Sequence, residues 1–141
     1  MQRWLWLVVL ILTGWSGTTY VLDGSVWVGL ALLAVGAVLS WWISPWKGGR
    51  TVRHRDVQAM NESDREVVIY WRLGCKFCAR LKSSLGALGS KAVWVNIWQD
   101  REAAEFVRSL NKGNETVPTV LFAGNPITNP DPEVVRERLS A

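Results

Sequence analysis

Two apolar runs fill the first third of this 141-residue chain and limit what it can fold into. Residues 4–22 read WLWLVVLILTGWSGTTYVL, and residues 25–46 read SVWVGLALLAVGAVLSWWISPW. Up to residue 46 the only charged side chains are Arg3 and Asp23. A membrane-spanning helix needs roughly 20 mainly apolar residues to cross a hydrocarbon core of about 30 Å. Each run has this length, so we predict a hairpin of two transmembrane helices within residues 1–46.

Two other interpretations of these runs have to be weighed against the hairpin. The first run weakens after Leu12, so residues 4–12 could be the apolar part of a cleaved secretory signal that precedes a single span. No Ala-x-Ala cleavage site follows it, however. Core helices of a soluble domain would need a more frequent polar boundary than this region offers. Seven of the ten tryptophans lie here, and a turn at residues 23–25 would place them near the two membrane interfaces, which supports the hairpin.

The basic residues around the runs predict the orientation of the hairpin. Lys47, Arg50, Arg53 and Arg55 follow the second run, and Arg3 precedes the first. Because cytoplasmic flanks gather Lys and Arg, we expect a multi-pass protein of the cell membrane with both ends in the cytoplasm. The formal net charge of +4 is then explained by topology and by contact with anionic lipid headgroups, without nucleic acid.

Residues 47–65 are polar and basic and are predicted to be a linker. Gly48 and Gly49 should make its start flexible, and a short helix is expected around Val57. His54 is the only histidine of the chain, and no acidic cluster accompanies it. We therefore interpret His54 as one more residue of the basic flank and expect no metal site.

Residues 66–141 have the pattern of a compact α/β domain. Residues 67–71, 92–98 and 117–123 are rich in β-branched and aromatic side chains, as strands are, and a short fourth strand should follow. The helix after the first strand carries apolar residues at helical spacing, namely Phe77, Leu81, Leu85 and Leu88. The predicted order is β-α-β-α-β-β-α.

Two further helices complete this predicted order. Asp100 should begin the second helix, whose apolar residues are Ala103, Phe106, Val107 and Leu110. Asp131 and Pro132 should begin the last helix, with Asp131 as its N-cap. These start signals fix where the connecting loops fall.

The two cysteines of the chain, Cys75 and Cys78, lie where the first strand passes into the first helix. A Cys-x-x-Cys at this junction is the thioredoxin-like arrangement. Cys75 falls at the helix start, where unpaired N–H groups and the helix dipole favour a thiolate. The charges of Arg72, Lys76 and Arg80 should add to this effect. Cys78, one turn further on, should lie deeper and be the less reactive thiol.

Other roles of the cysteine pair compete with the thioredoxin-like one. A disulfide across two intervening residues restrains little chain entropy, and structural zinc wants four Cys or His ligands. A redox sensor or binding module that is tethered to the membrane and has no turnover stays open. So does an exported thiol oxidase, if the topology is inverted.

Residues 67–139 resemble the glutaredoxin family, and in particular the mycoredoxins of bacteria that use mycothiol. The segments that carry the resemblance are CKFCARLKSSL, REAAEFVRSLNKGNETVPTVLFA and ITNPDPEVVRERL. The resemblance implies a thiol–disulfide oxidoreductase with no bound cofactor, which reduces protein mixed disulfides with a low-molecular-weight thiol, mycothiol or glutathione. It implies that Cys75 attacks, that Cys78 resolves and that Pro118 is a cis proline.

The resemblance also implies a set of thiol-binding residues. The backbone of Val117 would pair with the peptide-like part of the thiol, as a one-residue strand addition. The full set is Lys76, Phe77, Thr116, Val117, Pro118, Thr128 and Asn129. The chain departs from the family between its cysteines, where Lys76-Phe77 stands in place of the usual Pro-Tyr or the Gly-Tyr of mycoredoxin. The apolar hairpin lies outside the resemblance.

Overall fold

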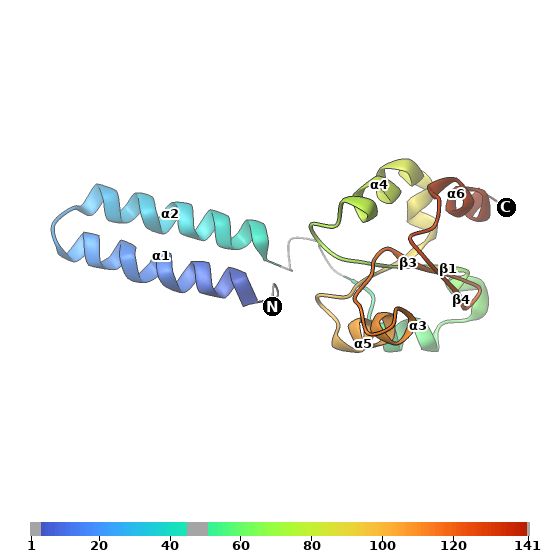
Figure 1. Cartoon of the computed structure of the whole chain (residues 1–141). Helices are drawn as coiled ribbons and strands as arrows, with labels where there is room; N and C mark the ends of the chain where they lie inside the picture. Colours follow the sequence, from blue (N-terminus) through green and yellow to red (C-terminus); the bar gives the residue numbers. More distant parts are fainter. Residues whose placement is uncertain (1–3, 45–50, 141) are drawn as a thin grey trace. The chain divides into compact units, whose positions relative to one another are not determined.

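A computed structural model describes residues 4–44 and 51–140, which form two compact units on either side of residues 45–50. The first unit is a pair of long helices, and the second is a sheet with helices on both faces (Figure 1). Several residues used in the topology prediction lie outside the described residues, namely Arg3, Trp46, Lys47, Gly48, Gly49 and Arg50.

The first unit is a hairpin of α1 (Leu5–Leu22) and α2 (Val26–Ile43). The turn between them is closed by the Ser25 N–H, which donates to the Tyr20 carbonyl at 2.9 Å. The helices approach closely at glycines, because a Cβ on Gly29 would lie 2.6 Å from the carbonyl oxygen of Gly17. Small residues therefore set the distance between the two helices.

The outward surface of this hairpin is apolar. Trp15 is 75% exposed and Trp27 is 86% exposed, and most large apolar side chains of both helices are exposed with them. A core helix of a soluble domain buries such side chains, and these two helices do not. By length and composition both helices are able to span a membrane.

The second unit is built on a four-stranded sheet with the strand order β2-β1-β3-β4. Its strands are β1 (Val67–Trp71), β2 (Val93–Asn96), β3 (Thr119–Phe122) and β4 (Asn125–Thr128). β1 runs parallel to β2 and antiparallel to β3, and β3 runs antiparallel to β4. β1 is central and buried on both faces, which explains its β-branched and aromatic composition. The predicted thioredoxin-like order of elements is confirmed.

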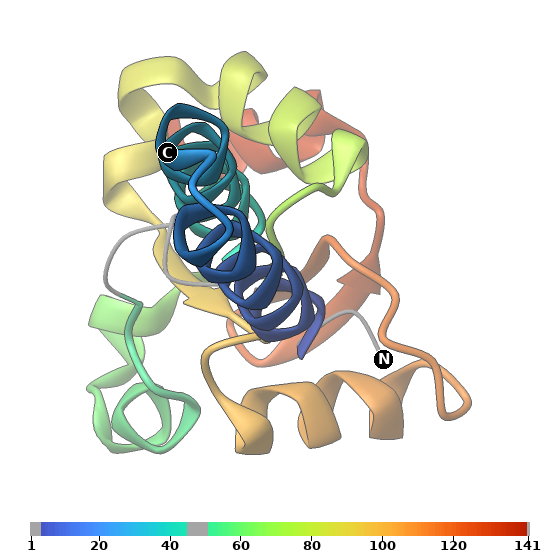
Figure 2. The same ribbon diagram turned by 90° about the vertical axis from the view of Figure 1, so that its left-hand side faces the viewer.

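Helices cover both faces of this sheet. α4 (Lys76–Leu85) and α6 (Pro132–Ser140) lie on one face, and α3 (His54–Ala59) and α5 (Arg101–Leu110) lie on the other (Figures 1 and 2). Residues of β1 serve both layers, because Ile69 packs with Leu81 and Val135 while Tyr70 packs with Val107. The strand that leads to the cysteines is thus held by two hydrophobic cores.

The predicted helix starts are confirmed in detail. The Asp100 carboxylate accepts the N–H groups of Glu102 at 3.0 Å and Ala103 at 3.4 Å, and so caps α5. Asp131 accepts the N–H of Glu133 at 3.0 Å at the start of α6. Such caps satisfy N–H groups that have no partner within the helix.

Some boundaries and apolar positions were predicted wrongly. Phe77 is 50% exposed, because it lies in the first turn of α4 at the end of the sheet, where no strand covers it. Leu110 is 37% exposed, because it is the last residue of α5. α4 ends at Leu85 and is capped by Gly86 (φ +52°). Leu88 therefore lies beyond α4, in the 3₁₀ helix η4 (Gly86–Lys91). β2 and β3 are shorter than predicted, since the chain turns after Asn96 and enters β3 only at Thr119.

The prediction that residues 51–65 belong to a linker is wrong. The short helix expected around Val57 is confirmed as α3, but a 3₁₀ helix, η3 (Glu62–Arg65), follows it and Val57 is a core residue. The Thr51 hydroxyl donates to the Trp94 carbonyl at 3.2 Å and accepts the Asn96 N–H at 2.7 Å, at the edge of β2. This segment is therefore part of the domain.

The interpretation of His54 as a flank residue is wrong for the same reason. Its side chain is buried, its ring Nδ1 lies 2.7 Å from the Tyr70 hydroxyl, and its ring packs on Phe106 with centroids 4.5 Å apart. Its backbone N–H donates to Asp100 Oδ2 at 2.6 Å. Burial lowers the pKa of His54, although the charges of Asp100 and Glu102 raise it. His54 therefore attaches α3 to α5 and β1.

We predict that the stability of the domain falls as the pH drops from about 7.5 through the unfolded-state histidine pKa of about 6.5, because of His54. Its folded-state pKa is lowered, so below the unfolded value of about 6.5 the unfolded chain binds the proton more readily, and stability is lost as the pH falls. Calorimetric unfolding of the full chain in detergent should show this slope in the wild type. It should be nearly absent in His54→Gln, since the chain has no other histidine.

The matched control is Arg55→Gln, an exposed substitution on the same helix, which should keep the slope of the wild type. The account of His54 is contradicted if His54→Gln and the wild type lose stability equally over this pH range.

Candidate active site

Cys75 is placed by the turn that connects β1 to α4. Gly74 has a positive φ of +75°, which glycine adopts without strain, and Cys75 then forms the N-cap of α4. The Cys75 sulfur accepts the backbone N–H of Cys78 at 3.2 Å. It lies where the free N–H groups and the positive end of the helix dipole stabilise an anion. The Cys75 sulfur thus takes the capping position at the start of α4.

Cys78 is in a different environment, one helical turn further along. It is only 3% exposed and packs in the core formed with Tyr70 and Val95, whereas Cys75 is half-buried. Burial raises the pKa of Cys78 to about 12, and the side-chain hydrogen bond with Cys75 acts in the same direction. The two thiols are not joined by a disulfide in this structure. They differ sharply in access to solvent.

The loop before β3 lies against the Cys75 sulfur. The Val117–Pro118 peptide bond is cis, as the family resemblance implied. The Cys75 S–H donates to the Val117 carbonyl at 3.4 Å, although the two residues are far apart in sequence. Pro118 is buried, and its carbonyl accepts the N–H of Asn129 at 2.7 Å. The loop and the cysteine pair therefore form one site.

An open groove surrounds the exposed side of Cys75. It is lined by residues from the start of α4, from the loop before β3 and from the segment after β4. Six of the sequence-predicted site residues line it beside Cys75, namely Arg72, Lys76, Phe77, Thr116, Val117 and Asn129. The structure thus brings most of the predicted thiol-binding residues together around one sulfur atom.

Besides the buried Cys78, three predicted site residues lie outside this groove. Arg80 and Pro118 line a neighbouring hollow, which they share with Phe77 and Asn129. Thr128 points elsewhere, because its hydroxyl donates to Asn111 Oδ1 at 2.6 Å. Arg80 therefore does not line the groove with Cys75, whereas Arg72 and Lys76 do.

The sequence analysis missed the residues that hold the loop before β3 in place. The Asn111 amide donates to the Val107 carbonyl at 2.8 Å and to Thr119 Oγ1 at 3.2 Å, and its oxygen accepts from Thr128. Asn111 thus connects the end of α5 with β3 and β4. An asparagine after a helix indicates only a turn, so no sequence signal revealed these bonds.

Arg108 and Glu115 make a second connection to the same loop. Arg108 Nη1 donates to Glu115 Oε1 at 2.6 Å, and both side chains are partly buried. Glu115 and its neighbour Asn114 also line the groove around Cys75. Neither Asn114 nor Glu115 was predicted to belong to the site. The groove therefore carries a carboxylate opposite Arg72 and Lys76.

This combination of features defines a class of enzyme. A thioredoxin-like sheet carries a Cys-x-x-Cys at the start of a helix, and a cis-proline loop lies beside the first sulfur. One thiol is accessible and the other is buried behind it. Proteins of this class are thiol–disulfide oxidoreductases, which exchange disulfides through an attacking thiolate.

Comparisons with known proteins identify the family within this class. The sequence profile of the glutaredoxin family, named Glutaredoxin, matches residues 67–127. A protein of Mycobacterium tuberculosis (H37Rv) with the provisional name of glutaredoxin is 46% identical to this chain over 74 residues. These residues cover 52% of this chain and 88% of that protein. Mycoredoxin 1 of Corynebacterium glutamicum is 40% identical over 65 residues, which cover 45% of this chain and 80% of that protein.

The chain belongs to the glutaredoxin family, and it is a mycoredoxin-like thiol–disulfide oxidoreductase. Membership of this family implies that a low-molecular-weight thiol acts as co-substrate. The family profile begins at β1, so the apolar hairpin and the segment with α3 lie outside it.

Proposed function

We propose that this protein is a membrane-anchored oxidoreductase that reduces mixed disulfides between proteins and a small thiol, with mycothiol as the favoured thiol and glutathione as the alternative. The observation that carries the proposal is the difference between the two cysteines. The Cys75 sulfur lies half-exposed in a groove at a helix start, and Cys78 lies buried behind it. This difference supports Cys75 as the attacking thiol and Cys78 as the resolving thiol.

The proposed reaction begins when the Cys75 thiolate attacks the small-thiol sulfur of a mixed disulfide. A disulfide forms between Cys75 and the small thiol, and the substrate protein leaves as its thiolate, which takes up a proton. A second molecule of small thiol then attacks this disulfide as a thiolate. It leaves as the oxidised small-thiol dimer and returns Cys75 to its thiolate form. The small thiol supplies both electrons.

Cys78 offers a second route from the same intermediate. After losing its proton it attacks the Cys75 sulfur, which releases the small thiol and forms a Cys75–Cys78 disulfide. Two molecules of small thiol then reduce this disulfide. The proximity of the two residues, with the Cys78 N–H 3.2 Å from the Cys75 sulfur, supports this route.

The groove supplies the groups that we propose bind the small thiol. Thr116, Val117 and Asn129 line it from the loop before β3 and the segment after β4, and Lys76 and Phe77 line it from the start of α4. Val117 would pair with the peptide-like part of the thiol through its backbone. Pro118 and Thr128 act by holding this loop, because neither lines the groove. Mycothiol is favoured because a mycoredoxin is among the similar proteins.

The hairpin is the proposed membrane anchor. Each of its helices has 18 residues, which at 1.5 Å per residue spans most of a hydrocarbon core of about 30 Å. Their large side chains form an apolar outer surface, as lipid contact requires. The basic residues that flank the hairpin in sequence support a catalytic domain that faces the cytoplasm.

We predict that Cys75→Ser abolishes the reduction of mixed disulfides, whereas Cys78→Ser keeps part of it, because the first route needs only one protein thiol. The assay follows release of the small thiol from a mixed disulfide of a test protein, with mycothiol and glutathione compared. In Cys78→Ser, mass spectrometry should find the small thiol bound to Cys75. Circular dichroism checks that both variants are folded. The opposite order of activities would contradict the assignment of the two thiols.

We predict that a tag placed after Ala141 resists external protease in intact cells and is cleaved once the cells are permeabilised. The physical reason is the charge asymmetry across the hairpin, whose connecting turn carries only Asp23. The protein should also stay in the membrane fraction after alkaline extraction. Cleavage in intact cells, with a cytoplasmic marker protected, would instead support an exported thiol oxidase.

A further inference from the structure

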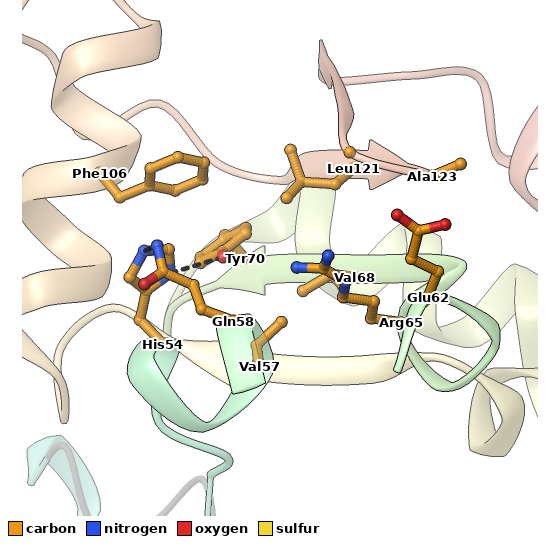
Figure 3. Close-up of a pocket in the computed structure, with 11 residues that line it drawn as sticks. His54, Val57, Gln58, Glu62, Arg65, Val68, Tyr70, Phe106, Leu121 and Ala123 are labelled. Atoms are coloured by element: carbon orange, nitrogen blue, oxygen red, sulfur yellow. Dashed lines mark hydrogen bonds between the residues drawn. The ribbon is translucent and has the colours of Figure 1, made fainter. Parts of the chain in front are cut away.

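A second cavity, of about 280 Å³, lies on the sheet face that α3 and α5 cover. It shares no lining residue with the groove around Cys75. Figure 3 shows side chains from α3, η3, α5 and the two strands β1 and β3 arranged around it. The reaction proposed for the cysteines does not use this cavity.

The cavity has an apolar wall and a neutral polar end. The apolar part is formed by Val57, Val68, Phe106 and Leu121. At the polar end the buried Tyr70 hydroxyl lies 2.7 Å from His54 Nδ1, and Gln58 Nε2 lies 3.0 Å from His54 Nε2. Burial lowers the pKa of His54, so this end carries no charge at neutral pH.

Arg65 brings a positive charge into this cavity. Its side chain extends across the cavity toward Tyr70, while the Glu62 carboxylate lies on the side nearer Ala123 (Figure 3). Within residues 4–44 and 51–140 no carboxylate lies within salt-bridge distance of the Arg65 guanidinium, and no hydrogen bond to it is formed. A half-buried guanidinium has five N–H donors in a fork that matches a carboxylate. The cavity therefore offers an unused anion-binding group beside apolar side chains.

We propose that this cavity binds a small monocarboxylate with a compact apolar body. Its carboxylate would accept two hydrogen bonds from the Arg65 guanidinium. Its apolar part would pack on Val68, Phe106 and Leu121. A cavity of about 150 Å³ accepts benzene, so this one has room for an aromatic ring with a short acidic side chain. Glu62, at the edge of the cavity, disfavours ligands with a second negative charge.

The test uses the full chain in detergent micelles and the probe pair phenylacetate and phenylacetamide, which differ mainly in charge. Methyl NMR signals of Val68 and Leu121 report occupation of the cavity. We expect phenylacetate to shift both signals in a saturable manner and to bind at least about tenfold more tightly than phenylacetamide, because hydrogen bonds to a charged group are the stronger ones. This comparison uses the wild-type protein and needs no variant.

Variants then test the residues. Arg65→Gln should weaken phenylacetate about tenfold or more and leave phenylacetamide unchanged, whereas the exposed Arg55→Gln should bind both probes as the wild type does. Glu62→Gln should bind phenylacetate as well as the wild type or better. The proposal is overturned if acid and amide bind equally, if neither shifts the two methyl signals, or if Arg65→Gln binds phenylacetate normally. Weaker phenylacetate binding by Glu62→Gln would show that this carboxylate assists binding instead of repelling a second negative charge, and would also overturn it.

Discussion

The hydrogen bond from the Cys78 N–H to the Cys75 sulfur is the interaction on which the chemistry proposed for this protein depends. It forms only because Cys75 is the N-cap of α4, so that the sulfur takes the place of the oxygen that usually caps a helix. The same geometry places Cys78 one turn further on, inside the core. One structural feature therefore places one sulfur partly exposed at the helix start and the second thiol in the core behind it.

The rest of the domain holds this helix start in place. β1 is buried on both faces, and the turn that carries Cys75 follows it directly. The Val117 carbonyl accepts from the Cys75 S–H, and just beyond this loop Asn111 connects the end of α5 to β3 and β4. The two hydrogen-bond partners of the Cys75 sulfur therefore come from α4 and from the loop that leads into β3. The helical hairpin is a separate unit, whose helices approach closely at glycines and whose outer surface is apolar.

Sequence patterns predicted the features that depend on local chemistry. The caps Asp100 and Asp131, the order of helices and strands along the chain and the position of Cys75 at a helix start could all be derived from residue types and spacing. The role of His54 could not, because its burial depends on Tyr70 and Phe106, which are distant in sequence. The polar and basic composition of residues 51–65 predicts a linker, because it does not reveal the apolar and aromatic contacts that these residues make. Asn111 was missed for the same reason, since its partners lie on three different elements.

The central claim is that the two cysteines differ because one caps a helix and the other lies in the core. The most direct measurement is the rate of iodoacetamide alkylation at each cysteine in the reduced full chain at pH 7, resolved by mass spectrometry. The account predicts that Cys75 reacts at least about tenfold faster than Cys78, because burial raises the pKa of Cys78 to about 12. In urea the two rates should become similar. Equal rates in the folded protein, or faster reaction at Cys78, would contradict the account.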